Sequence, residues 1–212
     1  NRETDIVSAI YKLGQDGILK TRRMGYDGKG QIRLGANIDP DVAIKAYNGE
    51  PAVFEKLVNF NLEISCLVAR DFKGNIVFYD CPRNVHRNQI LAESHVPANI
   101  PDDLEKLARA FAAKIAEKLN YVGVLAVEFF AIGGVTDTPL IVNEIAPRVH
   151  NSGHWTMDAC VCDQFENHIR AVAGWQLGTT RRHSNTMMIN MVGSDMDRWG
   201  EVASSEGAIL HV

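Results

Sequence analysis

Two glutamates stand inside apolar segments of the sequence. Glu128 lies within residues 122–130 and Glu144 within residues 140–145, and both segments are otherwise mostly hydrophobic. A carboxylate among buried apolar neighbours is unfavourable unless it is paired with a charge or bound to a metal. If both segments are strands, their side chains alternate between the two faces of the sheet. Glu128 then shares its face with Val124, Ala126 and Phe130, and Glu144 shares its face with Leu140 and Val142.

If these two strands pair around the loop between them, both carboxylates can point to one site. Two carboxylates together with phosphate oxygens form a ligand set that suits Mg²⁺. The alternative is that each glutamate simply pairs with an arginine such as Arg148.

A glycine-rich segment offers a second kind of chemistry. Residues 20–31 read Lys-Thr-Arg-Arg-Met-Gly-Tyr-Asp-Gly-Lys-Gly-Gln, with three glycines and four basic side chains. Glycine permits positive φ and close backbone approach, so N–H groups and lysine ammonium groups can surround phosphate oxygens. The segment is not a Walker A loop, because Gly30 follows Lys29, and Arg33 stands where a dinucleotide fingerprint needs its third glycine. Phosphate binding and a plain hairpin turn both fit this pattern.

Residues 148–154, Arg-Val-His-Asn-Ser-Gly-His, place several polar side chains directly after Glu144 and ahead of a predicted helix. Such loops bind anions, which favours a substrate-facing loop over a hydrogen-bonded loop without a ligand. His150 and His154 are four residues apart, but no glutamate follows the first histidine, so the zinc-protease motif is absent.

Hydrophobic periodicity predicts the elements that position these segments. We expect helices at 3–13, 40–47, 102–119 and 157–173, and strands at 17–21, 31–34, 52–58, 63–70, 75–80, 122–130, 140–145 and 186–192. The helix at 102–119 begins with two aspartates after Pro101, where negative charge suits the helix dipole. Its predicted buried stripe is Leu104, Leu107, Phe111, Ile115 and Leu119. Thr156 is the candidate N-cap of the helix at 157–173.

Several adjacent strands between helices favour an α+β fold with mainly antiparallel sheets. The 212 residues are 46% hydrophobic and 23% charged, as in ordinary soluble globular proteins. A net charge of −4 argues against a general nucleic-acid or membrane binder, and no apolar run reaches membrane-spanning length. The four cysteines have no zinc spacing, which favours reduced thiols in a cytoplasmic protein. The apolar run at the end and the absence of an initiator methionine suggest a fragment.

Taken in this order, the segments resemble the ATP-grasp superfamily. Within it they resemble the 5-(carboxyamino)imidazole ribonucleotide synthetases, which are ATP-dependent ligases of purine biosynthesis. The resemblance covers nearly the whole chain and rests on four motifs: residues 20–31, Glu-Lys-Leu-Val at 55–58, Asn-Val-His at 84–86, and Asn-Glu-Ile-Ala-Pro-Arg-Val-His-Asn-Ser-Gly-His-Trp-Thr at 143–156. It implies two lobes of mainly antiparallel sheet with helices and with ATP between them.

The resemblance also implies residue roles. Lys20 would reach the ATP phosphates, under a mobile lid made of Gly25, Tyr26, Asp27, Gly28, Lys29, Gly30 and Gln31. Adenine and ribose would be held by the hinge Glu55, Lys56, Leu57 and Val58, and by Glu63, with His86 near the nucleotide. Glu128 and Glu144 would bind Mg²⁺, with Asn143 beside the phosphates. Arg148, His150 and Asn151 would face the aminoimidazole ribonucleotide and carboxyphosphate, and Arg148, His150 and Lys29 would be the catalytic set.

The implied domains are a small lobe at 1–58, a large lobe at 59–175 and the start of a C-terminal domain at 176–212. The resemblance further implies an N-terminal domain and a C-terminal end outside this fragment, without which we expect no activity. The implied reaction is the ATP- and bicarbonate-dependent carboxylation of 5-aminoimidazole ribonucleotide through carboxyphosphate. The implied protein is a cytoplasmic homodimer with no nucleic-acid or membrane partner. Two rivals stay open: another ATP-grasp ligase, such as the formate-dependent glycinamide ribonucleotide transformylase, and a non-catalytic nucleotide-binding module.

Overall fold

The computed structural model describes residues 3–13, 16–23, 30–35, 51–132 and 140–211, and the chain divides into two compact units. The first unit comprises Asn1–Asn59 and Asn88–Ile90. Its described elements are helix α1 (Glu3–Leu13) and strands β1 (Gly17–Thr21), β2 (Gln31–Leu34) and β3 (Ala52–Lys56). The strands form an antiparallel sheet in the order β2-β1-β3. Ile10, Leu19, Leu34 and Phe54 form its core.

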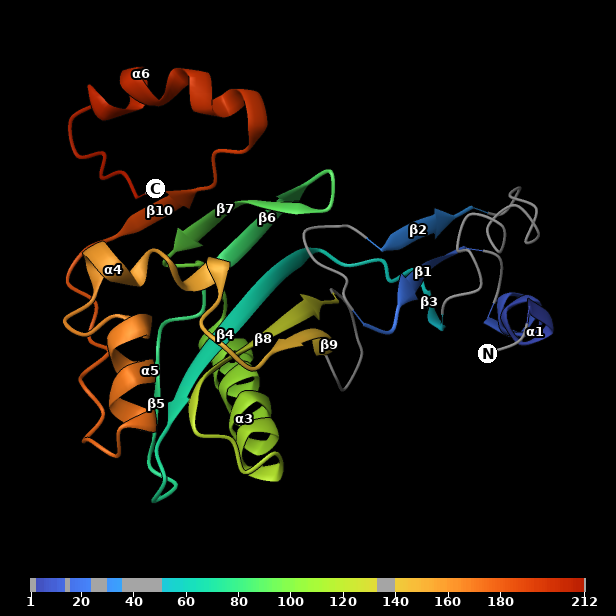
Figure 1. Cartoon of the computed structure of the whole chain (residues 1–212), viewed down its shortest axis with the longest axis horizontal. Helices are drawn as coiled ribbons and strands as arrows, with labels where there is room; N and C mark the ends of the chain where they lie inside the picture. Colours follow the sequence, from blue (N-terminus) through green and yellow to red (C-terminus); the bar gives the residue numbers. More distant parts are fainter. Residues whose placement is uncertain (1–2, 14–15, 24–29, 36–50, 133–139, 212) are drawn as a thin grey trace. The chain divides into compact units, whose positions relative to one another are not determined.

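The second unit comprises Phe60–Arg87 and Leu91–Val212 and contains the larger sheet (Figure 1). Its strands are β4 (Leu62–Arg70), β5 (Ile76–Phe78), β6 (Arg83–Arg87), β7 (Ile90–Val96), β8 (Gly123–Ala131), β9 (Leu140–Ala146) and β10 (Thr186–Ile189). Its helices are α3 (Asp102–Lys118), η1 (Asn151–Gly153), α4 (Thr156–Ala159), α5 (Gln164–Val172), η2 (Gly193–Arg198) and α6 (Trp199–Ala203).

The large sheet follows the order β10-β7-β6-β4-β8-β9, with β5 paired to β4. The pairings β4–β6, β4–β8, β8–β9 and β10–β7 are all antiparallel, which confirms the α+β class with mainly antiparallel sheets. β6 and β7 are joined by Asn88 and Gln89, both at positive φ, the geometry of a tight hairpin turn. β4 and β8 lie at the centre of the sheet and are buried along most of their length.

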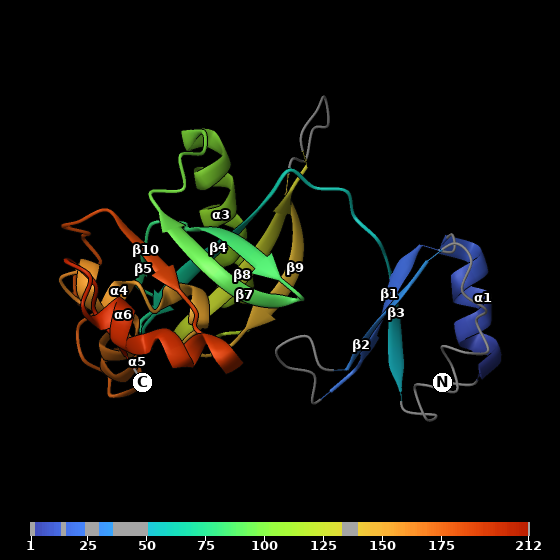
Figure 2. The same cartoon turned by 90° about the horizontal axis from the view of Figure 1, so that it is seen from above.

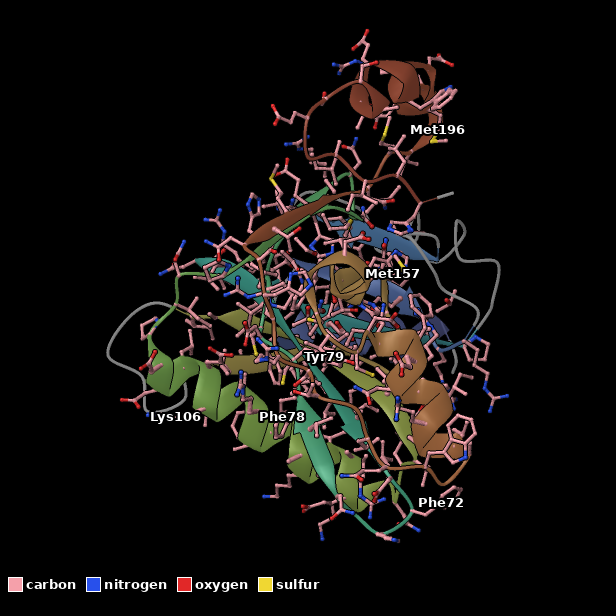
Figure 3. The ribbon with its side chains drawn as sticks, turned by 90° about the vertical axis from the view of Figure 1, so that its left-hand side faces the viewer. Phe72, Phe78, Tyr79, Lys106, Met157 and Met196 are labelled. Carbon is pink, nitrogen blue, oxygen red and sulfur yellow. The ribbon has the colours of Figure 1, made fainter. Side chains whose placement is uncertain are left out.

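Two helical layers cover the two faces of this sheet. α3 packs against β4 and β8 on one side, and α4 and α5 lie on the other (Figure 2). Figure 3 shows the division at two neighbouring residues: Phe78 lies beside α3, whereas Tyr79 belongs to the opposite core with Trp155. Tyr79 donates a hydrogen bond to the Cys162 carbonyl and accepts one from Asn167 of α5.

The centre of the buried face of α3 is formed by small side chains. Ala108, Ala112 and Ala116 are fully buried, whereas the larger residues Leu104, Leu107, Phe111 and Ile115 flank them and are partly buried. The predicted stripe is therefore confirmed at these four positions but wrong at Leu119, which is 57% exposed just after the helix ends. Alanine at the centre allows the helix axis to approach the sheet closely.

The predicted helix at 157–173 is wrong as one element. The chain forms α4, breaks at residues 160–163 and then forms α5. Asp163 caps α5, because its side chain accepts hydrogen bonds from the N–H groups of Phe165 and Glu166. Thr156 is not an N-cap but the first residue of α4, and its hydroxyl donates to Gly153 O and accepts from Gln164 N.

Several further expectations can be compared with the described residues. The helix at 3–13 and the strands at 17–21 and 31–34 are confirmed, whereas β6, β7, η2 and α6 were not predicted. The helix expected at 40–47 lies outside the described residues. The four cysteines are free and buried, in agreement with reduced thiols. No helix in the described part of the chain is long and apolar enough to cross a bilayer.

Candidate functional site

The two glutamates singled out in the sequence are direct cross-strand partners. Glu128 of β8 lies opposite Glu144 of β9, and an irregularity in the register follows immediately, because Phe129 pairs with Val142. Asn143 is therefore the extra residue of a β-bulge. The pairing brings the two carboxylates to the same face of the sheet.

The bulge corrects part of the sequence interpretation. Glu128 shares its face with Val124, Ala126 and Phe130, as alternation predicts. Glu144 does not share a face with Leu140 and Val142, because the extra residue shifts the alternation and turns those two side chains toward the α3 side. Nor is Glu144 buried: it is exposed on the edge strand, whereas Glu128 is only 8% exposed. The argument from buried carboxylates thus holds for Glu128 alone.

Two further titratable side chains lie near Glu128 on the neighbouring strands. Glu63 of β4 pairs across the sheet with Phe130, two residues beyond Glu128, and its carboxylate contacts the Nδ1 atom of His86 on β6. Partial burial opposes a charge on His86, but the hydrogen bond to Glu63 and the charges of Glu63, Glu128 and Glu144 raise its pKa overall. This part of the sheet therefore holds three carboxylates and one imidazole that favours a positive charge.

Burial dominates the electrostatics of Glu128. Burial is the main cause that raises the pKa of this carboxyl, the charge of His86 opposes it and the carboxylates of Glu144 and Glu63 support it, so that the pKa is about 7. A carboxylate whose ionised form is disfavoured in this way gains from a cation placed beside it. Among the residues that the structure describes, no arginine or lysine forms an ion pair with Glu128 or Glu144. The alternative pairing with Arg148 is therefore not observed.

The loop after β9 holds one buried and one exposed candidate side chain. Arg148 is exposed, and among the described residues its guanidinium donates only to the neighbouring Val149 carbonyl, at 2.9 Å. His150 is 8% exposed, and its backbone is held on both sides by the Gln164 amide of α5. Its N–H donates to Gln164 Oε1 at 2.9 Å, and its carbonyl accepts from Gln164 Nε2 at 2.8 Å. Asn151, which begins η1, is half-buried.

The ring of His150 faces Glu128, with 4.0 Å between Nε2 and the nearer carboxylate oxygen. Burial, together with the charge of Arg148, lowers the pKa of His150 to about 4. The imidazole is thus neutral at neutral pH, and the contact is not an ion pair there. Since 4.0 Å is also too long for a hydrogen bond, the two groups do not satisfy each other.

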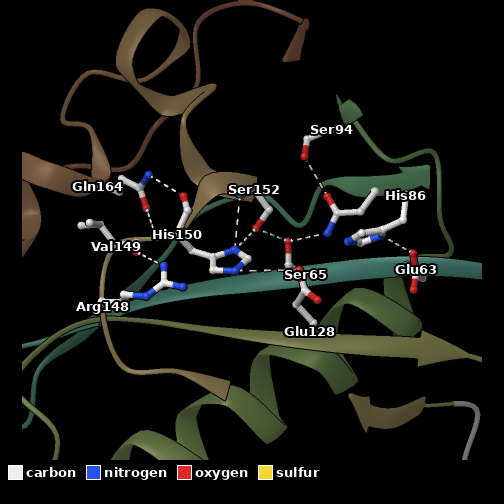
Figure 4. A network of polar contacts seen from close by, with 11 residues as sticks. Glu63, Ser65, His86, Ser94, Glu128, Arg148, Val149, His150, Ser152 and Gln164 are labelled. Atoms are coloured by element: carbon white, nitrogen blue, oxygen red, sulfur yellow. Dashed lines mark hydrogen bonds and ion pairs between the residues drawn. The ribbon is translucent and has the colours of Figure 1, made fainter. Parts of the chain in front are cut away.

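The sequence alone assigned no role to four polar side chains that are linked to His150 (Figure 4). Ser65, Asn84, Ser94 and Ser152 are buried and linked to one another and to His150 by hydrogen bonds. A usable signal was present: Ser65 is a hydroxyl residue inside the apolar strand β4, opposite Glu128 in the register.

The remaining candidates belong to the first unit. Lys20 of β1 forms an ion pair with Glu55 of β3, with 2.7 Å between Nζ and Oε2, and Gln31 lies opposite Lys20 in the register. Lys56 ends β3, and Leu57 and Val58 follow it. Gly30 has φ +75°, a value that favours glycine. The other lid candidates, Gly25, Tyr26, Asp27, Gly28 and Lys29, lie outside the described residues.

The packing at Gly153 gives a prediction about the support of His150. A Cβ atom added here would collide with the side chain of Leu67 and lie 2.6 Å from Gln164 Oε1, the atom that holds the His150 N–H. Because this environment is fully buried, we expect Gly153→Ala to lower the free energy of unfolding by roughly 1–3 kcal/mol. Chemical denaturation measures this change. Gly200→Ala is the matched control, since nothing lies within 4 Å of its Cβ position. Equal stability of the two variants would contradict the tight packing.

Comparison with known proteins identifies one family model and a set of relatives that this chain resembles. The family model of the ATP-grasp domain matches residues 1–165. An N5-carboxyaminoimidazole ribonucleotide synthase from Brucella melitensis is 47% identical over 99% of this chain and 58% of its own length. The crystal structure of an ADP complex of an N5-carboxyaminoimidazole ribonucleotide synthetase superposes with a TM-score of 0.88 and 40% identity, over 95% of this chain and 53% of that one.

A third relative carries a second ligand. It is the N5-carboxyaminoimidazole synthase from Aspergillus clavatus, whose crystal structure is a complex with ADP and 5-aminoimidazole ribonucleotide. It superposes with a TM-score of 0.84 and 25% identity, over 96% of this chain and 54% of that one. The chain thus spans little more than half the length of each of these relatives.

Proposed function

Because the chain belongs to the ATP-grasp family, we propose that it is the nucleotide-binding part of a ligase that carboxylates 5-aminoimidazole ribonucleotide. The reaction would use ATP and bicarbonate, pass through carboxyphosphate and serve de novo purine biosynthesis. The names of the relatives support this assignment. Within the structure, the observation that carries it is the facing pair Glu128 and Glu144, with His150 beside Glu128.

A divalent cation fits this pair. The described residues contain no group of three or more His, Cys, Asp or Glu that could hold a metal by itself. Two carboxylates would then be completed by phosphate oxygens and water, which is the usual environment of Mg²⁺ beside a nucleotide. Bound Mg²⁺ would neutralise charge on the phosphates during transfer. Glu128 and Glu144 would hold it. Asn143, the bulge residue next to Glu144, would lie beside the phosphates.

The other residues would bind and orient the substrates. Lys20 and Lys29 would neutralise phosphate charge, and the lid formed by residues 25–31 would exclude water, which otherwise hydrolyses carboxyphosphate.

The hinge at 55–58 and Glu63 would hold adenine and ribose, and His86 would lie near the nucleotide. Arg148, exposed and without an acidic partner among the described residues, would bind the anionic carboxyphosphate, and His150 and Asn151 would face the ribonucleotide.

We assign residues 1–58 to the small lobe, 59–175 to the large lobe and 176–212 to the start of a C-terminal domain. We further propose a cytoplasmic homodimer with small-molecule substrates. Sedimentation of the complete protein tests the dimer, and a monomer at micromolar concentration would contradict it.

The central test is the acid that supports ATP hydrolysis by the complete protein. With aminoimidazole ribonucleotide present, we expect ADP release to require both bicarbonate and Mg²⁺ and to cease when EDTA removes the metal. Formate replaces bicarbonate in the control reaction, because it would be the substrate of the rival transformylase. Stimulation by formate, or ATP binding without turnover under either condition, would overturn the proposal.

A further inference from the structure

Four buried side chains connect His150 to the distant strand β7 (Figure 4). They come from four separate elements: Ser152 from η1, Ser65 from β4, Asn84 from β6 and Ser94 from β7. The three serines are 0% exposed and Asn84 is 5% exposed. Each polar atom must therefore find its hydrogen-bond partner inside the protein.

The direction of these hydrogen bonds starts from a backbone amide. The N–H of Ser152 lies 3.3 Å from His150 Nδ1, and an amide can only donate, so Nδ1 is an acceptor. A neutral imidazole has one acceptor nitrogen, so its proton is on Nε2. The hydroxyl of Ser152, 2.9 Å from the same Nδ1, must also donate to it.

The remaining directions follow one after another. Because the Ser152 hydroxyl donates to the ring, its oxygen accepts from the Ser65 hydroxyl at 2.7 Å. The Ser65 oxygen then accepts from Asn84 Nδ2 at 3.0 Å, and Asn84 Oδ1 accepts from the Ser94 hydroxyl at 2.9 Å. All four side chains donate toward His150.

We propose that Ser94, Asn84, Ser65 and Ser152 form a one-way hydrogen-bond chain that holds His150 as the Nε2–H tautomer, with this N–H facing Glu128. In this form His150 is a hydrogen-bond donor at the site, and it binds an anionic oxygen of the carboxylate or phosphate class. It does not accept a proton at Nε2. The four side chains are positioning residues, and this role rests on the proposed function, whereas the tautomer does not.

The wild-type test is spectroscopic. The complete protein is labelled with ¹⁵N in its histidine rings, and a His150→Gln sample identifies the signals of His150. The ¹⁵N chemical shifts distinguish a protonated from an unprotonated ring nitrogen. We expect a proton on Nε2 and none on Nδ1 at neutral pH. A proton on Nδ1, or a freely exchanging mixture, would overturn the proposal whatever the variants do.

Asn84→Asp tests the direction of the chain. A carboxylate cannot donate, so Ser65 must turn its hydroxyl toward it and can no longer donate to Ser152. We expect the ratio of the Nε2–H to the Nδ1–H tautomer of His150 to fall by roughly tenfold, the effect of one hydrogen bond. Asn120→Asp is the matched control, because Asn120 is exposed just after α3, and it should leave the ratio unchanged.

A double variant separates the chain from the charge. In a Ser65→Ala background the connection is broken, so adding Asn84→Asp should no longer change the tautomer ratio. The same tenfold change in that background would mean that the new carboxylate acts through space, and the chain would be refuted.

Turnover supplies the second readout. In the complete protein we expect Asn84→Asp to lower the kcat of bicarbonate-dependent ATP hydrolysis roughly tenfold and to leave the KM for ATP unchanged, whereas Asn120→Asp changes neither. An unchanged kcat would overturn the positioning role. If the wild-type protein shows no bicarbonate-dependent turnover, the proposed function fails and the positioning role with it, while the spectra still decide the tautomer.

Discussion

Replacing Glu128 by glutamine should abolish most of the activity of the complete protein while making the folded chain more stable at alkaline pH. The amide keeps the shape of the side chain but removes the charge that would bind Mg²⁺. Loss of a metal's charge stabilisation in phosphoryl transfer amounts to several kcal/mol, so we expect turnover to fall by roughly a thousandfold, about 4 kcal/mol. Steady-state ADP release at saturating ATP and Mg²⁺ measures this.

The stability gain follows from the raised pKa of Glu128. Its value of about 7 in the folded chain, against an ordinary 4.5, means that folding favours the neutral carboxyl. The cost of ionising it therefore appears as pH rises above 4.5 and is complete above about 7. Without metal at pH 8, we expect Glu128→Gln to raise the free energy of unfolding by roughly 1–3 kcal/mol, and to leave it unchanged at pH 4.

Glu144→Gln provides the contrast. Glu144 is exposed, so the same chemical change should lower turnover comparably without increasing stability. Denaturation curves of both variants in EDTA, at the two pH values, make the comparison. A Glu128→Gln variant that keeps wild-type turnover, or that is destabilised at pH 8, would contradict this account of the site.

The second large effect is expected at Arg148, where activity should be lost without loss of stability. The guanidinium is exposed, and within the part of the chain that the structure describes its one hydrogen bond goes to the Val149 carbonyl. If it binds the anionic carboxyphosphate, Arg148→Ala removes a charge-assisted hydrogen bond worth about 2 kcal/mol, which is roughly a thirtyfold loss in carboxylation rate. Radiolabelled bicarbonate incorporated into the product measures that rate.

The control for Arg148 is a second exposed arginine of the same unit. Arg198 forms a surface ion pair with Glu201, and Arg198→Ala should leave the carboxylation rate unchanged. Both variants should unfold within about 0.5 kcal/mol of the wild-type protein, since exposed substitutions rarely change stability by more. A rate for Arg148→Ala equal to that of Arg198→Ala would contradict the proposed contact.

The regular elements of the chain could be predicted because each has a local signal. The periodicity of α1 and α3, and the apolar runs of β4, β8 and β9, define these elements to within a residue or two. The break between α4 and α5 has no such signal. It depends on Asp163, whose carboxylate accepts hydrogen bonds from N–H groups that would bond to backbone carbonyls in a continuous helix. It depends also on the hydrogen bond from Gln164 N to the Thr156 hydroxyl.

The site divides in the same way. That Glu128 and Glu144 meet could be predicted from two strands around one loop, but the bulge at Asn143 could not, since alternation assumes a regular pleat. The buried partners Ser65, Asn84 and Ser94 come from three strands that meet only through the strand order β7-β6-β4. β6 and β7 carry charged and polar side chains along much of their length, so they escaped prediction, and with them the hydrogen bonds of Asn84 and Ser94.

The extra residue in β9 lets one short segment direct side chains first to one face of the sheet and then to the other. Leu140 and Val142 turn toward α3, and Glu144, only two positions later, turns the other way. In a regular pleat, Glu144 would lie on the same face as Leu140 and Val142, so the strand could not pack against α3 and also direct its carboxylate toward Glu128. The orientation of Glu144 therefore depends on the bulge itself: if Asn143 entered a regular pleat, Glu144 would share a face with Leu140 and Val142 and turn away from Glu128, although every chemical group would still be present.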